Sequence, residues 1–428
     1  MTVSAPFMPS IQLSASFTAD PFGMPTWTDI STRFRSAQTA RGRQIAGGLA
    51  GVLNGFDMGT MTLNLSNVDG ALDPTYASSP YYPNVLPGTP IKLAATWNGV
   101  SYPLFFGYAW TFSPQYVQSA DEVMQVTVND AFSMLQNLQY VMNAGVPGEY
   151  TGSRISRILS AVMPSVSQAQ IAAGNSHMVA ILAQTGSSTP GGYASQAPNT
   201  ATALDLCQQA EQTEYGSFYF DVDGTPIFED RYFRASQAVV AAFSDAGTFM
   251  PSGVGTFPGI AYQNLVPSMD MTYLYNDVQV TDGLGRFYEY TDAASVTKYG
   301  QQSLQVQSQA DAPNEGLSMA QWIVMTQKDA AMRFTSLQMM PQQDLTQLDY
   351  LYSQALGREI SDLVVVERNP PSGNTMVQYC FIDRVEHDIT PTTWTTTFGL
   401  SAQSQFSFTP WQLDNSNFRL GTNTTLGW

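Results

Sequence analysis

Residues 27–82 carry, in this order, Trp27-Thr28-Asp29-Ile30, Arg41-Gly42-Arg43-Gln44, Asn67-Val68-Asp69-Gly70, Asp73-Pro74 and Ser79-Pro80-Tyr81-Tyr82. Between the second and third of these motifs, Met61, Leu63 and Leu65 alternate with polar residues. A period of two residues is typical of a β-strand with one buried and one solvated face. The segment therefore predicts a strand in a half-buried sheet.

Tight turns are expected after this strand and further along the chain. Asp69-Gly70 supplies the positive φ that a tight turn needs, and Asp73-Pro74 stops the strand from continuing. The apolar segments 90–97 and 102–108 flank Asn98-Gly99, a pair that favours a type I′ connection. We therefore expect a second hairpin there.

The composition is that of a turn-rich and aromatic-rich β protein with few charges. Of 428 residues, 12% are aromatic and 12% are charged, and the chain holds 33 Gly and 25 Pro. The length allows several domains with a large core. A free monomer usually keeps more charge on its surface, so we expect this chain to work in an assembly.

The formal net charge is −17, which argues against a protein that grips nucleic acid. Binding to a phosphate backbone needs clustered Lys and Arg. Two interpretations of the acidity stay open. One is an acidic lumen past which DNA slides, and the other is a surface that serves solubility alone.

The sequence contains no targeting or membrane segment. The N-terminus lacks a basic segment before an apolar run, and no stretch of about 18 apolar residues occurs. Cys207 and Cys380 are too few for a disulfide scaffold and are expected to be buried, reduced thiols. We expect synthesis in a cytoplasm and no membrane insertion.

The two β-rich ends of the chain share one layout. Residues 99–131 run from an apolar strand through Ser113-Pro114 to an alternating strand. Residues 373–402 repeat this layout around Thr390-Pro391. Two copies of one barrel are the economical explanation. The alternative is that any two hairpins look alike at this level.

Helical patterns lie between these ends. Ser153 is expected to cap a helix that continues to Val162, and residues 184–200 are expected to form an exposed loop. The other predicted elements are a helix at 202–213, a hairpin at 218–228, a helical stripe from Met319 to Phe334, a short helix at 348–356 and a buried strand at 363–366.

The order of these motifs resembles that of baseplate-hub and minor tail proteins of long-tailed bacteriophages, especially the actinophage-like siphophages. The opening motifs are similar to the N-terminal barrel of such hubs. Asn276-Asp277-Val278-Gln279-Val280, Asp292-Ala293-Ala294-Ser295-Val296 and Tyr299-Gly300 are similar to the strand, loop and turn of the second barrel. The resemblance covers residues 20–405.

In that family the hub is a homotrimer, and two similar barrels per chain form a pseudo-sixfold ring. The resemblance implies a structural virion protein, made in the host cytoplasm, at the distal end of the tail. It would adapt the sixfold tail tube or distal tail ring to a threefold tip. It would also form the channel for the tape measure protein and for DNA, which passes without specific binding. Other implied partners are the distal tail protein and other tail-tip or fibre proteins.

The predicted fold is mainly β with α+β insertions: two similar antiparallel β-barrel hub domains plus helical insertion domains. The expected domains are a first hub barrel at 1–135 completed by 217–250, a helical and loop insertion at 136–216, a second hub barrel at 251–315 plus 360–405, a helical insertion at 316–359 and a C-terminal arm at 406–428.

The sequence offers no catalytic or metal-binding constellation. His177 and His387 lie in different predicted domains, and the carboxylates beside His387 fall on the opposite face of its strand. Asp221-Val222-Asp223-Gly224 superficially resembles a calcium loop, but Tyr232 stands where an EF-hand needs Glu. We therefore expect no enzyme, no cofactor and no metal site.

Two alternatives to the trimeric hub stay open. A hexameric distal tail ring protein also uses an N-terminal barrel and assembles as a ring. A carbohydrate-binding or cell-wall-degrading tail protein needs only two acids across a cleft, with aromatic residues for sugar stacking. A groove lined by two acids and an aromatic would favour the latter.

The interface candidates are Arg41, Gly42, Arg43, Trp411 and Trp428. The two arginines on an acidic chain are candidates for an ion pair between subunits, with Gly42 allowing a tight turn. The alternative is a solvated loop. The aromatic C-terminal segment is expected to be an arm that docks on a neighbour by strand addition, or else a disordered end.

Overall fold

A computed structural model describes residues 7–17, 24–43, 55–115, 122–140, 149–163, 180–181, 201–230, 233–246, 248–249, 256–269, 271–310 and 315–405. Within these residues the fold is mainly β, as predicted, and most strands belong to one 15-stranded sheet. None of the described helices is both long enough and apolar enough to span a membrane.

The first half of the chain supplies five antiparallel strands, here called the first unit. Along the chain, the first strand pairs with the second, the second with the fifth, the fifth with the fourth and the fourth with the third. Met61, Leu63 and Leu65 are buried, and Asn98 and Gly99 both have positive φ, so the predicted strand and hairpin are confirmed. The strands are β3 (Phe34–Gly42), β4 (Asp57–Ser66), β5 (Pro90–Trp97), β6 (Val100–Gln115) and β7 (Val123–Asn129).

The second half supplies five strands with the same pairing, here called the second unit. Again the first strand pairs with the second, the second with the fifth, the fifth with the fourth and the fourth with the third, all antiparallel. The strands are β15 (Asn264–Ser268), β19 (Arg333–Met339), β20 (Leu363–Arg368), β21 (Met376–Ile389) and β22 (Trp394–Ala402). The repeated layout predicted from residues 99–131 and 373–402 is therefore present as a repeated strand order.

The fourth strands of the two units match in detail. The register of β6 shifts between Ala109 and Thr111, and that of β21 shifts between Ile382 and Arg384. Ala109 donates to the carbonyl of Thr89 and accepts from the amide of Gly88. Ile382 likewise donates to Asp362 and accepts from Ser361. The bulge residues Trp110 and Asp383 therefore occupy equivalent places in the two units.

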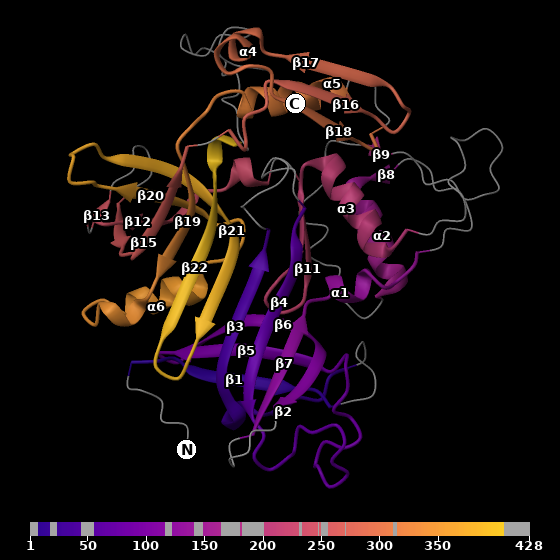
Figure 1. The fold of residues 1–428 in the computed structure, drawn as a ribbon, viewed down its shortest axis with the longest axis vertical. Coiled ribbons are helices and arrows are strands. Elements are labelled where there is room, and N and C mark those ends of the chain that lie inside the picture. The colour runs from indigo at the N-terminus through magenta and orange to yellow at the C-terminus, as the bar shows by residue number, and fades with distance from the viewer. Residues whose placement is uncertain are drawn as a thin grey trace, which may run out of the picture.

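One strand pair joins the two units. β3 pairs antiparallel with β21, from Arg384 opposite Gly42 to Ile389 opposite Ala37. Figure 1 shows the resulting sheet, with β15 and β19 on the left, then β22 and β21, then β3 and β4 of the first unit. The described strands form an open, branched path instead of a closed ring, so two separate barrels are not confirmed.

Further strands extend each unit beyond its third strand. β1 pairs antiparallel with β5, whereas β12 pairs parallel with β20, so the two units differ here. These flanking strands are β1 (Ser10–Ala15), β2 (Thr28–Asp29), β12 (Val239–Ser244), β13 (Thr248–Phe249) and β14 (Phe257–Ile260). Short 3-10 turns lie at Ser31–Arg33, Arg234–Ser236, Pro341–Gln343 and Gln403–Gln405.

A helical insertion between the units packs against the sheet. Thr202 caps α3 through a capping box with Asp205, while α2 follows Tyr150 without a side-chain cap. Ser153 therefore lies inside α2, and its predicted capping role is wrong because the helix begins earlier. The elements are α1 (Phe132–Leu135), β8 (Glu149–Tyr150), α2 (Thr151–Val162), β9 (Ala180–Ile181), α3 (Ala203–Glu214), β10 (Ser217–Phe220) and β11 (Pro226–Glu229).

A second insertion forms a separate three-stranded sheet covered by a helix. Residues 277–280 of the segment expected in the second barrel lie in one of its strands, β16. Val278, Val280, Ile323 and Val324 belong to its core. The elements are β16 (Asp277–Thr281), β17 (Phe287–Thr291), α4 (Ala293–Tyr299), β18 (Ser303–Gln307) and α5 (Glu315–Gln327).

The predicted helical segment 316–359 is only partly helical. α5 ends at Gln327, so the predicted stripe to Phe334 is too long. Arg333 and Phe334 belong instead to β19, whose backbone groups pair with β15 and β22. The short helix predicted at 348–356 is confirmed as α6 (Leu348–Gly357), which packs on the core of the first unit through Tyr352.

Candidate functional site

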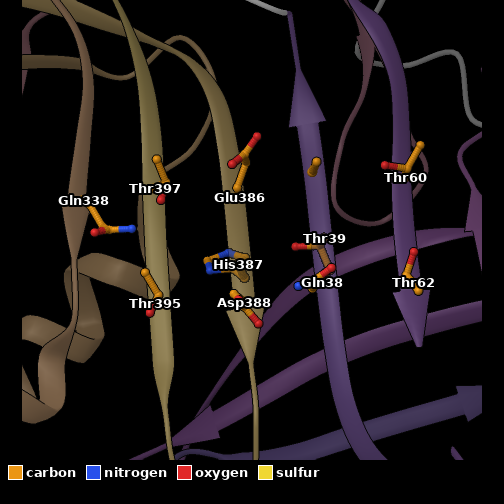
Figure 2. Close-up of a pocket in the computed structure, with 11 residues that line it drawn as sticks. Gln38, Thr39, Thr60, Thr62, Gln338, Glu386, His387, Asp388, Thr395 and Thr397 are labelled. Carbon is orange, nitrogen blue, oxygen red and sulfur yellow. The ribbon is translucent and has the colours of Figure 1, made fainter. Parts of the chain in front are cut away.

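One face of the main sheet carries two rows of polar side chains. The rows follow from the register, because directly paired residues of neighbouring strands point to the same side. Figure 2 shows these side chains around a hollow of about 520 Å³. The first row is Gln338, Thr397, Glu386 and Thr60, with the small Ala40 between the last two, and the second is Thr395, Asp388, Gln38 and Thr62.

The polar rows present mainly uncharged groups. Glu386 and Asp388 are the charged members, and Glu386 pairs with Arg384 of its own strand. Hydroxyls and amides bind water and other polar groups, but they do not hold a phosphate as a cluster of cations does. The alternate residues, such as Val385 and Phe398, are buried on the opposite face. The sheet therefore has one packed face and one polar face.

His387 lies between the two polar rows and is among the residues that line the hollow, but its side chain is buried. Its side chain is 4% exposed, and its Nδ1 lies 3.1 Å from the hydroxyl of Thr396 and 3.4 Å from Nε1 of Trp394. Burial lowers the pKa of His387 to about 3, with a further contribution from Arg41. The imidazole is therefore neutral near pH 7 and packs with Trp394. Within the described residues, no group of three or more potential ligands could hold a metal ion.

Arg41 lies behind the polar face at the junction of the two units. Its guanidinium is buried and pairs with Glu359 at 2.5 Å, and its Nη1 lies 3.8 Å from a carboxylate oxygen of Asp221. Both partners belong to the same chain. The charge predicted to meet another subunit is therefore already paired within this chain. An intersubunit role for this segment stays a prediction.

Arg43 belongs to a second buried network at the same junction. Its Nη2 donates to the hydroxyl of Ser217 at 3.1 Å, and its Nε lies 3.7 Å from Oδ1 of Asp383. Arg234 donates to the same oxygen at 2.6 Å and lies 3.8 Å from Glu229. Burial opposes ionisation of Asp383, but Arg234 and Arg43 together lower its pKa. The network links β3, the β10–β11 hairpin and β21.

Gly42 has a backbone role that differs from the tight turn expected from the sequence. Its φ is +112°, and a Cβ atom added there would lie 2.0 Å from the carbonyl oxygen of Asp383. The next amide, that of Arg43, donates to this carbonyl at 3.0 Å. Only glycine allows β21 to approach β3 so closely. The residue was expected to permit a tight turn, and the structure shows that it permits a close strand contact.

Two buried carboxyl groups hold the first unit to its surroundings. Glu211 of α3 accepts from the amides of Phe218 at 3.0 Å and Phe56 at 3.3 Å. Asp130 accepts from the amides of Gly59 at 2.6 Å and Phe132 at 2.9 Å. Burial raises the pKa of each carboxyl to about 7, although these hydrogen bonds act in the opposite direction.

Some predicted residues lie outside the described part of the chain, and some important ones were missed. Trp411, Trp428, His177 and the loop 184–200 lie outside it. Cys207 and Cys380 are buried and unpaired, as predicted. Sequence reasoning missed the polar rows, although the alternation of Thr60 and Thr62 with apolar residues was a signal. The sequence also contained no sign of the partners of Arg41 and Arg43 within the chain.

Comparisons with known proteins find similarity in structure only. No protein-family model matches the chain, and no curated protein matches it. A tail protein from Neisseria meningitidis matches with a TM-score of 0.53 and 10% identity, over 92% of this chain and 97% of that one. A 43 kDa prophage tail protein from Shewanella oneidensis matches with a TM-score of 0.52 and 10% identity, over 92% and 98%. The chain shares the fold of these proteins along most of its length.

Proposed function

We propose that this chain is a structural protein of a bacteriophage tail and that three copies form the hub at its distal tip. The shared fold with two tail proteins supports the class of protein. The resemblance of the sequence motifs to hub proteins supports the position and the number of copies. The proposal includes no catalytic step and no cofactor.

The repeated strand order is the observation that carries the hub proposal. Within the chain, the first strand of one unit pairs with the fourth strand of the other, as β3 does with β21. Among the described strands, β15 pairs only with β19, and no strand lies beside β6 beyond Ala109 except β7. These two edges are equivalent to β3 and β21. Pairing β15 of one copy with β6 of the next would repeat the same junction.

Repetition of that junction generates a ring. Head-to-tail contacts between different surfaces of identical chains close into rings when the rotation allows it. Three chains would contribute six similar units, so the ring would match a sixfold tube on one side and a threefold tip on the other. The two units, β3 to β7 and β15 to β22, would then take the place of the two expected barrels.

The polar rows would line the channel of this ring. The opposite face of the sheet is covered by the insertions, whereas the hollow at Gln38 and Thr62 is open. A lining of hydroxyls and amides with few cations would let the tape measure protein and DNA pass without specific binding. The distal tail protein or tail tube, and other tail-tip or fibre proteins, would bind the ends of the ring.

The mass of the purified full chain tests this function. Native mass spectrometry and light scattering over a concentration series should find a trimer. A hexamer would favour a distal tail ring protein instead. A monomer at every concentration that also binds polysaccharide would overturn the structural role and favour a carbohydrate-binding tail protein.

A further inference from the structure

The two open edges of the main sheet carry exposed apolar side chains at equivalent ends. On β6, Trp110 is 49% exposed. Just beyond the end of β15, Met269 is 65% exposed, and Met332, next to the residue that pairs with Ser268, is 43% exposed. Large exposed apolar side chains that gather at an edge mark contact sites.

The junction between β3 and β21 inside the chain shows which residues lie in contact at the equivalent position. Asp383 is the bulge residue of β21, and the residue after the end of β3 is Arg43. Asp383 is 1% exposed there, and its carbonyl accepts from the amide of Arg43. Trp110 is the bulge residue of β6, equivalent to Asp383. By register, Val266 takes the place of Gln38, so Met269 takes the place of Arg41, two residues before that of Arg43 and within diagonal reach of a Trp side chain at the bulge position.

We propose that a second copy of this chain places its Trp110 against Met269 and Met332, so that an apolar contact takes the place of the buried charge network found inside the chain. This inference rests on the proposed ring and names the residues that determine its interface. The backbone of Thr111 to Gln115 would pair with β15 of the neighbour. Trp110 would lie at the end of that pairing, as Asp383 does in the internal junction.

The two junctions differ in chemistry because one forms during folding and the other would form when copies assemble. The internal junction forms once, during folding, and its charges are buried together with their partners. The edge between copies must be exposed to water before assembly, and an unpaired charge network would have to be desolvated when it closes. A Trp ring against Met side chains gains apolar contact area without that cost. Interface hot spots are enriched in Trp for this reason.

A double-mutant cycle on the full chain tests the contact. Trp110→Ala and Met269→Ala are compared singly and together, with Phe287→Ala as the control, because Phe287 is an aromatic residue 59% exposed on the separate β16–β18 sheet. Dissociation constants are measured by sedimentation over a concentration series. Monomer melting temperatures are measured in parallel and should stay close to that of the unmodified chain.

We expect Trp110→Ala to weaken assembly by roughly 30-fold or more, the loss typical of a Trp that is an interface hot spot. Met269→Ala should add little once Trp110 is absent, because contacting residues are not additive. Phe287→Ala should have no effect. Unchanged assembly of Trp110→Ala, or losses that simply add, would overturn this contact while leaving the ring intact. A chain that stays monomeric without any substitution would overturn the ring and the contact together.

Discussion

The internal junction between β3 and β21 and the open edges of β6 and β15 occupy equivalent places in two units with the same strand order. The internal junction uses a glycine, a buried aspartate and two arginines, whereas the edges carry Trp110 and Met269. Equivalent places in one strand arrangement therefore carry different chemistry. The internal contact relies on paired charges, whereas the proposed contact between copies would rely on apolar side chains.

The largest effect is expected from breaking the internal junction. Asp383→Ala should lower the free energy of unfolding by about 4 kcal/mol, because it leaves Arg43 and Arg234 buried without their carboxylate. Urea unfolding measures this loss. The control is Asp388→Ala on the polar face, which should change stability by less than about 0.5 kcal/mol. Similar losses for both variants would contradict the role given to the buried network.

Substitutions at equivalent core positions of the two units should lower the free energy of unfolding by similar amounts. Leu63 of β4 and Leu337 of β19 are both fully buried and occupy the same place in the repeated register. Leu63→Ala and Leu337→Ala should each cost about 3 kcal/mol, the usual loss when a buried Leu leaves a cavity. Calorimetry should show one cooperative transition for both. Two separate transitions would show that the units fold independently despite the shared junction.

The folded chain should lose stability as the pH rises, because the buried carboxyl of Glu211 then loses its proton. Folding raises its pKa from 4.5 to about 7, so the folded chain holds this proton more tightly than the unfolded chain. The stabilisation is complete below about pH 4.5 and is lost as the pH approaches about 7. Its full size is roughly 3 kcal/mol.

Glu211→Gln isolates this contribution. The amide oxygen of Gln can still accept from Phe56 and Phe218, but it does not titrate. The difference in unfolding free energy between the variant and the unmodified chain should therefore change between pH 5 and pH 8. A difference that stays constant across this range would contradict the assigned pKa.

Substitutions on the polar face should have the smallest effect on stability but a clear effect on DNA binding. Gln38→Lys and Thr62→Lys together should change unfolding by less than about 0.5 kcal/mol, because the side chains face the open hollow. Binding to duplex DNA should appear at low salt and weaken as salt rises. Strong DNA binding by the unmodified chain would contradict a passive lining.

Local signals in the sequence were enough to predict several elements. The alternation in β4, the Asn98-Gly99 turn and the helix at 348–356 depend on neighbouring residues and are confirmed. The end of α5 was missed, because residues 328–332 favour a helix and the pairing of β19 with distant strands, which begins at Arg333, is not visible in the local sequence. The separate β16–β18 sheet was missed for the same reason.

The candidate site was harder to predict because its partners are distant in sequence. Arg41 and its partner Glu359 are 318 residues apart. The strand β3 itself was not predicted, although Ala37, Thr39 and Arg41 alternate with more exposed residues. If residues 34–42 had been predicted as a strand, the alternation would have placed Arg41 on its buried face. Its intramolecular partners would still have needed the structure.

Cross-linking between copies tests the proposal that β6 and β15 of neighbouring chains repeat the junction of β21 and β3. Asp388 lies opposite Gln38 within the chain, and the equivalent pair between chains is Gln115 and Val266. Full chains carrying only Gln115→Cys are mixed with chains carrying only Val266→Cys and are oxidised. Directly opposed strand residues lie close enough for a disulfide.

We expect a covalent dimer that contains one chain of each variant. Cys207 and Cys380 are buried and should not compete. Val377→Cys, at a similarly exposed position on β21, replaces Val266→Cys as the control and should give no such dimer. Failure of the Gln115→Cys and Val266→Cys pair to cross-link, under conditions where the chain assembles, would contradict the shared junction.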